Sequence, residues 1–254
     1  MIAVGLDIGS IAVKGILING ACRHQAIEPT GWSPREAGNK VIYQLLDQSG
    51  LQAKNIDQVF ATGYGRVAFE GADRTITEIK CHARGITEID PDIRTIIDIG
   101  GQDSKVIRVD ANGRVIDFAM NDKCAAGTGR FLQVMAVALG MDVSELGEAE
   151  DSAQPATINS MCTVFAESEI IGLLSRGQSR GSIIAGLHQS VGKRVAAMVK
   201  RMGVQKEVAF TGGVARNAGV KRALEEELGC SLIVPDICQY TGALGAALFA
   251  LQTQ

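Results

Sequence analysis

Apolar and polar residues form two different patterns along this chain. Short apolar runs are typical of buried strands, and longer segments with apolar residues every three or four positions are typical of amphipathic helices. Segments of the second kind predict helices over residues 33–50, 76–89, 127–140, 163–177, 182–203, 215–229 and 241–252. Strands are predicted within residues 2–18, 56–66, 93–109, 113–122, 206–213 and 230–236. Because strands alternate with helices throughout, the predicted fold class is α/β.

One predicted helix, over residues 33–50, carries start and stop signals at both ends. Ser33 stands at its start, Pro34 follows at the first helical position, and Glu36 lies three residues after the serine. Gly50 closes the segment. This order of residues is typical of a capped helix.

Two segments of the chain repeat each other. Residues 2–18 and 93–109 each contain an apolar strand, the tripeptide Asp-Ile-Gly, a turn and a second strand. The aspartates are Asp7 and Asp98, and a lysine follows each after seven residues. The pattern predicts a duplicated strand-turn-strand unit.

Composition narrows the classes of partner. The 254 residues carry a formal net charge of −3, with acidic and basic residues interspersed. That balance offers neither a basic face for nucleic acid nor a polybasic segment for a membrane surface. The N-terminus lacks the basic region of a signal peptide, and the apolar residues 241–252 are too few to span a bilayer. We expect a soluble cytoplasmic protein that binds small molecules or other proteins.

The glycine turns suggest phosphate binding. A glycine beside an aspartate at a strand end lets the backbone approach a ligand, and turn amides can bind phosphate while the carboxylate holds hydrated magnesium. A single turn of this kind is also common hairpin chemistry. A third glycine turn at residues 210–217 follows a strand and precedes a helix, which suits a nucleotide. Neither a Walker motif nor a Rossmann glycine motif occurs in the sequence.

Four segments carry a resemblance to a known superfamily. LDIGSIAVK, IDIGGQDSK, FTGGVARN and TGALGAAL resemble the phosphate-1, phosphate-2, adenosine and second connecting segments of the actin, heat-shock chaperone and sugar-kinase ATPases. The resemblance implies two duplicated, ribonuclease H-like lobes with an ATP cleft between them. Lobe I would comprise residues 1–94 plus 240–254, and lobe II residues 95–239.

The same resemblance assigns roles to residues of the turns. Asp7 and Asp98 would flank the magnesium ion, and Asp98 or Gln102 would orient the attacking water. Gln102 could equally be a phosphate contact, and Lys14 and Lys105 could be phosphate contacts or ordinary strand residues. The catalytic candidates are thus Asp7, Asp98 and Gln102. The nucleotide-binding candidates are Gly9, Ser10, Lys14, Gly100, Gly101, Asp103, Gly212, Gly213 and Asn217.

Two cysteines lie just before predicted helices. The chain has six cysteines and no CxxC pair: Cys22, Cys81, Cys124, Cys162, Cys230 and Cys238. Cys124 and Cys162 each precede a helix, whose N-terminus stabilises a thiolate. Packing as small buried apolar residues is the alternative for both. Two thiols are too few for an iron–sulfur cluster or a structural zinc, but a symmetric homodimer could supply four.

The sequence segments around these two cysteines resemble motifs of one protein family. DKCAAGTGRFL and SMCTVFAESE resemble the two cysteine motifs of the activators of 2-hydroxyacyl-CoA dehydratases, a family that includes the ATPase subunits of benzoyl-CoA reductase. EIKCHARG resembles a further segment, and the likeness covers essentially the whole chain. It implies a homodimer with one shared four-iron, four-sulfur (4Fe-4S) cluster, for which Cys124 and Cys162 are the ligands. Cys81 would be structural, and Cys22, Cys230 and Cys238 would be packing residues.

The family resemblance also implies a reaction and partners. ATP hydrolysis would drive a low-potential electron into a dehydratase or reductase, and a ferredoxin or flavodoxin would supply it. Two other functions remain open. One is a small-molecule kinase on the same fold, which would leave the cysteine motifs without a role, and the other is a zinc-bridged or redox-sensing dimer that uses the same thiols.

Overall fold

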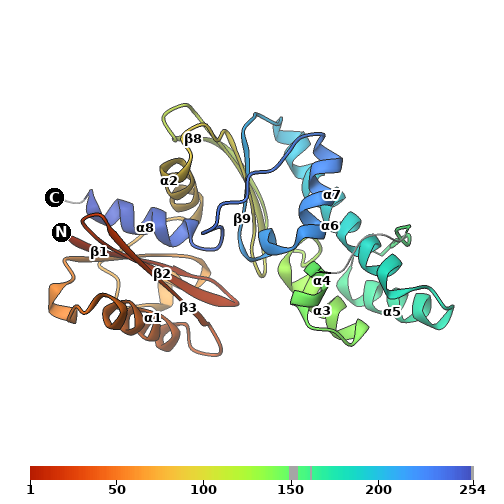
Figure 1. Cartoon of the computed structure of the whole chain (residues 1–254), viewed down its shortest axis with the longest axis horizontal. Helices are drawn as coiled ribbons and strands as arrows, with labels where there is room; N and C mark the ends of the chain where they lie inside the picture. The colour runs from red at the N-terminus through yellow and green to blue at the C-terminus, as the bar shows by residue number, and fades with distance from the viewer. Residues whose placement is uncertain (149–153, 161, 253–254) are drawn as a thin grey trace. The chain divides into compact units, whose positions relative to one another are not determined.

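The computed structural model describes residues 1–148, 154–160 and 162–252, which form two compact units. Unit 1 contains Met1–Ile96, Ile107–Ile116 and Asp236–Gln254, and unit 2 contains Ile97–Val106 and Asp117–Pro235. The elements are strands arranged in two sheets, together with α-helices and short 3-10 helices (Figure 1). The predicted α/β class is confirmed. None of the described helices is both long enough and apolar enough to cross a membrane.

A five-stranded sheet forms the centre of unit 1, in the order β3-β2-β1-β4-β5. Its strands are β1 (Ile2–Ile8), β2 (Ala12–Asn19), β3 (Cys22–Pro29), β4 (Gln58–Thr62) and β5 (Arg74–Thr75). The first three are antiparallel neighbours, whereas β4 runs parallel to β1 and β5 runs parallel to β4. The register places Asp7 opposite Lys14 on β2 and opposite Thr62 on β4.

Helices cover both faces of this sheet. They are α1 (Pro34–Ser49), α2 (Glu78–Ile89) and α8 (Thr241–Leu251), with 3-10 helices η1 (Ala53–Asn55) and η2 (Tyr64–Ala68) in the connections. Val4 packs in one cluster with Leu45 of α1, and its neighbour Ala3 packs in another with Ala246 of α8. Successive strand residues point to opposite faces, so α1 and α8 lie on opposite sides of the sheet, as Figure 1 shows.

The capped helix predicted over residues 33–50 is confirmed. The Ser33 hydroxyl accepts a hydrogen bond from the backbone N–H of Glu36 at 3.2 Å. Gly50 ends the helix in the left-handed conformation, with φ of 67°. Strand β3 was not foreseen, because its exposed polar residues hide the strand pattern.

A four-stranded sheet in the order β8-β7-β6-β9 includes the second aspartate turn. Its strands are β6 (Thr95–Ile99), β7 (Ser104–Val109), β8 (Val115–Asn121) and β9 (Val208–Thr211). The helices of unit 2 are α3 (Gly129–Leu139), α4 (Val143–Glu148), α5 (Thr163–Ser175), α6 (Arg180–Met202) and α7 (Ala218–Leu228), with the 3-10 helix η3 (Gly213–Arg216).

The strand predicted over residues 230–236 is wrong. Only a single bridge joins this segment to the sheet, between Ile233 and Ala209. Ile233 makes both of its backbone bonds to β9, since its N–H donates to the Val208 carbonyl at 2.9 Å and its carbonyl accepts from the Phe210 N–H at 2.8 Å. The next residue placed to donate to β9 would be Pro235. Pro235 has no N–H to donate. The segment therefore cannot extend a ladder beyond its one bridge.

Candidate functional site

The first aspartate turn, in unit 1, joins β1 to β2. Asp7 lies at the end of β1 with 6% of its surface exposed, and the Lys14 ammonium is 3.4 Å from its carboxylate. The backbone N–H of Gly9 donates to the Ala12 carbonyl at 3.1 Å and closes the turn. A Cβ at Gly9 would lie 2.9 Å from both this carbonyl oxygen and the Lys14 nitrogen. Glycine is therefore required here, and the half-buried Ser10 follows it.

The second aspartate turn, in unit 2, repeats this arrangement between β6 and β7. Asp98 is 3% exposed, and the Lys105 ammonium lies 3.6 Å from its carboxylate and 2.7 Å from that of Asp103. The Gly100 N–H donates to the Asp103 carbonyl at 2.9 Å. Gln102 is exposed at the turn. Both lysines that follow the aspartates thus pair with carboxylates in this structure.

The second turn is bonded directly to the start of helix α3. The backbone N–H groups of Gly129 and Arg130 donate to the carbonyls of Gly100 and Gly101, each at 2.8 Å. A Cβ at Gly129 would lie 3.1 Å from the Gly100 oxygen. The glycine therefore allows the helix to approach the turn this closely. The segment that contains Cys124 leads into this same helix.

A threonine–glycine pair stands beside each aspartate, and only the second pair was predicted to belong to the nucleotide site. Thr62 is the register partner of Asp7, and the Thr211 hydroxyl donates to Asp98 at 2.8 Å. Gly63 and Gly212 follow them with φ of 92° and 88°, and each precedes a 3-10 helix. In the sequence the two segments, ATGYGR and FTGGVAR, share only the Thr-Gly pair that follows an apolar strand.

The third glycine turn places its predicted residues in different environments. Gly212 contacts Ile99 of β6, whereas Gly213 is exposed. Asn217 is buried and caps helix α7, because its side-chain oxygen accepts from the Val220 N–H at 2.9 Å. In this structure that oxygen of Asn217 therefore has a capping role.

Substitution of Gly212 by alanine tests this turn. Its backbone angles belong to a region that only glycine occupies readily, and a Cβ would meet the Ile99 carbonyl oxygen. We expect Gly212→Ala to reduce the free energy of unfolding by about 3 kcal/mol. Gly20→Ala is the matched control: its φ is also positive, at 59°, but no atom lies within 4 Å of the added Cβ. We expect it to cost about 1 kcal/mol. Urea unfolding measures both, and equal losses would contradict the close approach to Ile99.

Cys124 lies in a half-buried loop between β8 and α3. The Asn121 side-chain amide donates to the Cys124 carbonyl at 2.8 Å and to the Ala126 carbonyl at 3.3 Å. Thr128 begins the helix and donates both its N–H and its hydroxyl to the Ala125 carbonyl. The loop backbone is therefore fixed while the Cys124 thiol stays partly accessible.

Cys162 is exposed and occupies the N-cap position of α5. Its carbonyl accepts from the Ala166 N–H at 2.8 Å, but its side chain makes no capping hydrogen bond. The thiol thus stands at the positive end of a helix, where a thiolate is stabilised. The prediction that Cys162 lies at a helix N-terminus is confirmed, whereas Cys124 lies four residues before the cap of α3.

Glu169 holds the segment that precedes Cys162, a role that was not predicted. Its carboxylate accepts hydrogen bonds from the Asn159 N–H at 3.0 Å, the Asn159 amide at 3.0 Å and the Ser160 N–H at 2.8 Å. Burial works against ionisation, but these hydrogen bonds lower the pKa of Glu169 below its ordinary value of 4.5. The stabilisation is therefore complete above pH 4.5 and is lost as the pH falls through the lowered value.

Substitution of Glu169 by glutamine tests this role. The amide keeps one acceptor but loses the charge, so we expect the backbone amides of Asn159 and Ser160 to exchange hydrogen about ten-fold faster at neutral pH. Glu167→Gln removes the same charge from the same helix and should leave both amides unchanged. Hydrogen exchange read by mass spectrometry measures the effect. Equal exchange in the two variants would show that Glu169 does not hold the segment.

The remaining cysteines divide by exposure. Cys81 is buried in a core cluster with Ala3, Phe60 and Ala246, as expected of a structural residue, and burial raises the pKa of its thiol to about 12. Cys238 is buried as predicted for a packing residue, and Cys230 is half-buried. The packing prediction for Cys22 is wrong, because this side chain is exposed at the start of the edge strand β3.

The described residues of a single chain do not form a complete metal site. No group of three or more His, Cys, Asp or Glu side chains there could hold a metal ion. Cys124 and Cys162 are both free cysteines, of which the first is half-buried and the second exposed. Soft thiolate donors suit an iron–sulfur cluster, which takes four of them. The donor set of one chain therefore fits half of such a site.

The fold is shared with the sugar kinases. A sugar-kinase relative of this fold, a ROK family glucokinase from Streptomyces griseus, aligns with a TM-score of 0.57 at 12% identity, over 100% of both chains. The chain belongs to the BadF/BadG/BcrA/BcrD ATPase family, whose model matches residues 4–250.

Two proteins are similar to this chain over nearly their whole length. The 2-hydroxyisocaproyl-CoA dehydratase activator of Clostridioides difficile is 51% identical over 98% of this chain and 95% of its own. Its structure with bound ADPNP aligns with a TM-score of 0.92, over 99% of this chain and 95% of that chain. Component A of the Acidaminococcus fermentans (R)-2-hydroxyglutaryl-CoA dehydratase has a TM-score of 0.95 at 45% identity, over 99% and 98% of the two chains.

Proposed function

We propose that this protein is an ATP-hydrolysing activator whose homodimer holds one 4Fe-4S cluster and passes a low-potential electron to a partner 2-hydroxyacyl-CoA dehydratase or reductase. The observation that carries the proposal is the bonding of the second aspartate turn to helix α3. Two backbone hydrogen bonds of 2.8 Å join Gly100 and Gly101 to Gly129 and Arg130. A change at this turn therefore reaches the helix that follows Cys124. The names of the relatives, as dehydratase activators, support the same role.

The two aspartate turns are proposed to bind the phosphates of Mg-ATP. Asp7 and Asp98 are buried carboxylates at strand ends, suited to hydrated magnesium. Lys14 and Lys105 already lie beside them and can neutralise phosphate charge once it arrives. The Clostridium difficile activator, whose structure contains ADPNP, supports nucleotide binding by this fold.

Asp98 is proposed to orient the water that attacks the terminal phosphate. Thr211 donates to one of its oxygens, which fixes the carboxylate, and Lys105 neutralises part of its charge. A carboxylate held in this way can accept a hydrogen bond from water and align it. Gln102 stands exposed at the same turn and is proposed to contact phosphate or this water.

Cys124 and Cys162 are proposed as the cluster ligands. When bound, the cluster would supply one-electron transfer at low potential. Cys162 would hold it at the N-terminus of α5, where the helix dipole offsets negative charge. The bonds from Asn121 and Glu169 would keep both cysteine segments in place.

A second copy of the chain is proposed to supply the other two thiolates. Helix α5, which begins after Cys162, exposes large apolar side chains: Val164 is 68% exposed, Phe165 67% and Ile171 53%. Apolar side chains exposed together on one helix are typical of an interaction surface. A two-fold axis beside this helix would cover them and bring the two pairs of cysteines together.

Activation of a partner enzyme tests this function. The protein, purified without oxygen and reduced by dithionite or by a ferredoxin or flavodoxin, is mixed with a 2-hydroxyacyl-CoA dehydratase. We expect dehydration to begin with Mg-ATP and not with a non-hydrolysable analogue. Phosphate transfer to a sugar by the cluster-free protein would support a kinase instead. Zinc without iron and sulfide would support the zinc-bridged dimer.

A further inference from the structure

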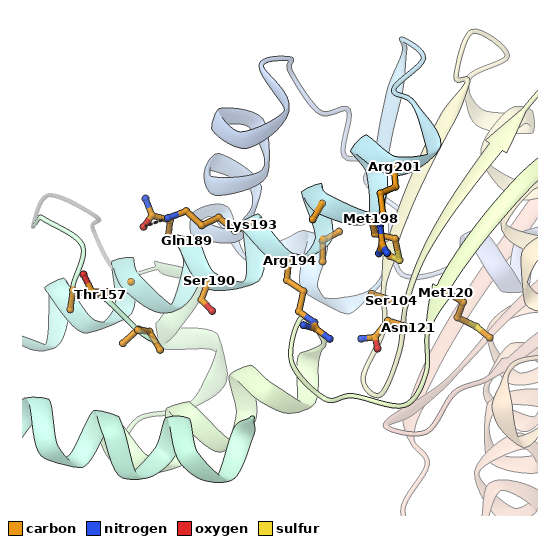
Figure 2. A pocket seen from close by; sticks show the side chains of 15 residues that line it. Ser104, Met120, Asn121, Thr157, Gln189, Ser190, Lys193, Arg194, Met198 and Arg201 are labelled. Carbon is orange, nitrogen blue, oxygen red and sulfur yellow. Dashed lines mark hydrogen bonds between the residues drawn. The ribbon is translucent and has the colours of Figure 1, made fainter. Parts of the chain in front are cut away.

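Unit 2 contains a cavity of about 690 Å³ beside helix α6 (Figure 2). This volume lies within the range of small-molecule sites. Its walls are one face of α6, the ends of β7 and β8, and residues 156–158. The polar lining includes Ser104, Asn121, Thr157, Ser190, Arg194 and Arg201.

The cavity lies on the other side of the sheet from the second aspartate turn. Ser104 lines it, and Ser104 is the neighbour of Lys105 on β7. Adjacent strand residues point to opposite faces, and Lys105 points to Asp98 and Asp103. A ligand of this cavity is therefore distinct from a phosphate bound at that turn.

The charge of the lining is positive. Lys193, Arg194 and Arg201 all contribute to it, and within the described ranges no aspartate or glutamate does. Lys193 bonds to the Gln189 amide oxygen at 3.1 Å, an uncharged partner. Arg194 and Arg201 are two helical turns apart on one face of α6, about 10 Å along its axis. Cations along one wall of a cavity concentrate anions there.

The arginine side chains are directed into the cavity. Figure 2 shows Arg194 extending from α6 toward Asn121, and Arg201 extending beside Met198 in the direction of Ser104. An arginine fork can bind a phosphate or carboxylate through two parallel hydrogen bonds. The hydroxyl and amide groups nearby can donate further hydrogen bonds to the same ligand.

Two residues of this lining also hold the Cys124 loop. Asn121 donates to the Cys124 carbonyl, and the Arg194 side chain packs against Gly127, where an added Cβ would lie 3.3 Å from the Arg194 Cδ. Gly127 has a φ of 82°, so the loop turns sharply at this contact. A ligand that pairs with Arg194 would therefore contact one of the two residues, Asn121 and Arg194, that hold the Cys124 loop.

We propose that this cavity is a binding site for a small phosphate- or carboxylate-bearing anion, which Arg194 and Arg201 bind and which contacts the support of the Cys124 loop. The proposal of an anion site rests on the residues that line the cavity and does not depend on the proposed electron transfer. Phosphate- and carboxylate-bearing ligands share a compact anionic group with several oxygen atoms that accept hydrogen bonds.

Calorimetric titration of the full chain tests the site. Saturating Mg-ADP first fills the nucleotide site, and free magnesium is held constant. Inorganic phosphate is the probe in one arm and citrate in the other. We expect one of them to bind with a dissociation constant of about 1 mM or below. Tighter binding of phosphate assigns a phosphate ligand, and tighter binding of citrate assigns a carboxylate ligand.

Variants separate this site from general attraction of anions. Arg194→Gln and Arg201→Gln should each raise the dissociation constant about ten-fold, and Arg194→Lys should raise it less. Arg180→Gln removes a charge from the exposed first residue of the same helix and should change nothing. Unchanged Mg-ADP affinity shows that each variant is folded. If Arg194→Gln does not fold, Arg201→Gln alone tests the site. Absence of binding at about 10 mM of both probes, or equal effects of all three glutamine variants, would overturn the proposal.

Discussion

Replacement of Cys162 or Cys124 by alanine is expected to remove nearly all iron and sulfide from protein purified without oxygen. Each homodimer would lose two of four cluster ligands, and a cluster is not held by two thiolates. ATP hydrolysis should stay within about two-fold of the unmodified protein, because the aspartate turns are untouched. Iron and sulfide analysis, the visible spectrum and a phosphate-release assay measure these effects.

Cys22→Ala provides the matched control for the cysteine variants. Cys22 is exposed, like Cys162, but lies at the start of β3 in unit 1. We expect this variant to keep its full iron content. A complete cluster in Cys124→Ala would refute the assignment of that residue as a ligand. Loss of iron in Cys22→Ala would show that the whole protein is sensitive to thiol removal.

Asp98→Asn is expected to reduce the rate of ATP hydrolysis about 100-fold or more while leaving nucleotide affinity within about ten-fold. Asparagine keeps an acceptor for the Thr211 hydroxyl but loses the charge that would align water. Lys105 keeps Asp103 as its partner at 2.7 Å, so no buried cation is left alone. Phosphate release and binding of a fluorescent nucleotide measure the two quantities.

The control for this variant is Asp110→Asn. Hydrogen bonds from the backbone N–H groups of Arg114 and Asn112 lower the pKa of Asp110 in the β7–β8 turn, and asparagine can accept the same bonds. We expect its hydrolysis rate to be unchanged. Turnover in Asp98→Asn at the unmodified rate would remove Asp98 from the catalytic residues.

The sequence predicted the features that depend on residues close together in the chain. The duplicated Asp-Ile-Gly hairpins, the caps of α1 and the N-terminal position of Cys162 all depend on residues close in sequence. Contacts over long separations were not predictable in this way. The bonds from Gly129 and Arg130 to the second turn join residues about thirty positions apart and involve only backbone atoms.

A missing backbone donor explains a further difference. Residues 230–236 have the composition of a strand, but Pro235 has no N–H with which to continue the ladder that Ile233 begins. Thr62 and Gly63 repeat Thr211 and Gly212, yet the two segments share few letters. Their equivalence became clear only from the strands and aspartates beside them.

The central proposal is a cluster shared between two chains, and one measurement tests it most directly. Iron and acid-labile sulfide are determined per chain on protein purified without oxygen, with its mass in solution measured by light scattering. We expect about two iron and two sulfide per chain in a dimer, which corresponds to one four-iron cluster for two chains. A colourless protein without iron that cannot be reconstituted would contradict the shared cluster and leave an ATPase whose cysteines have another role.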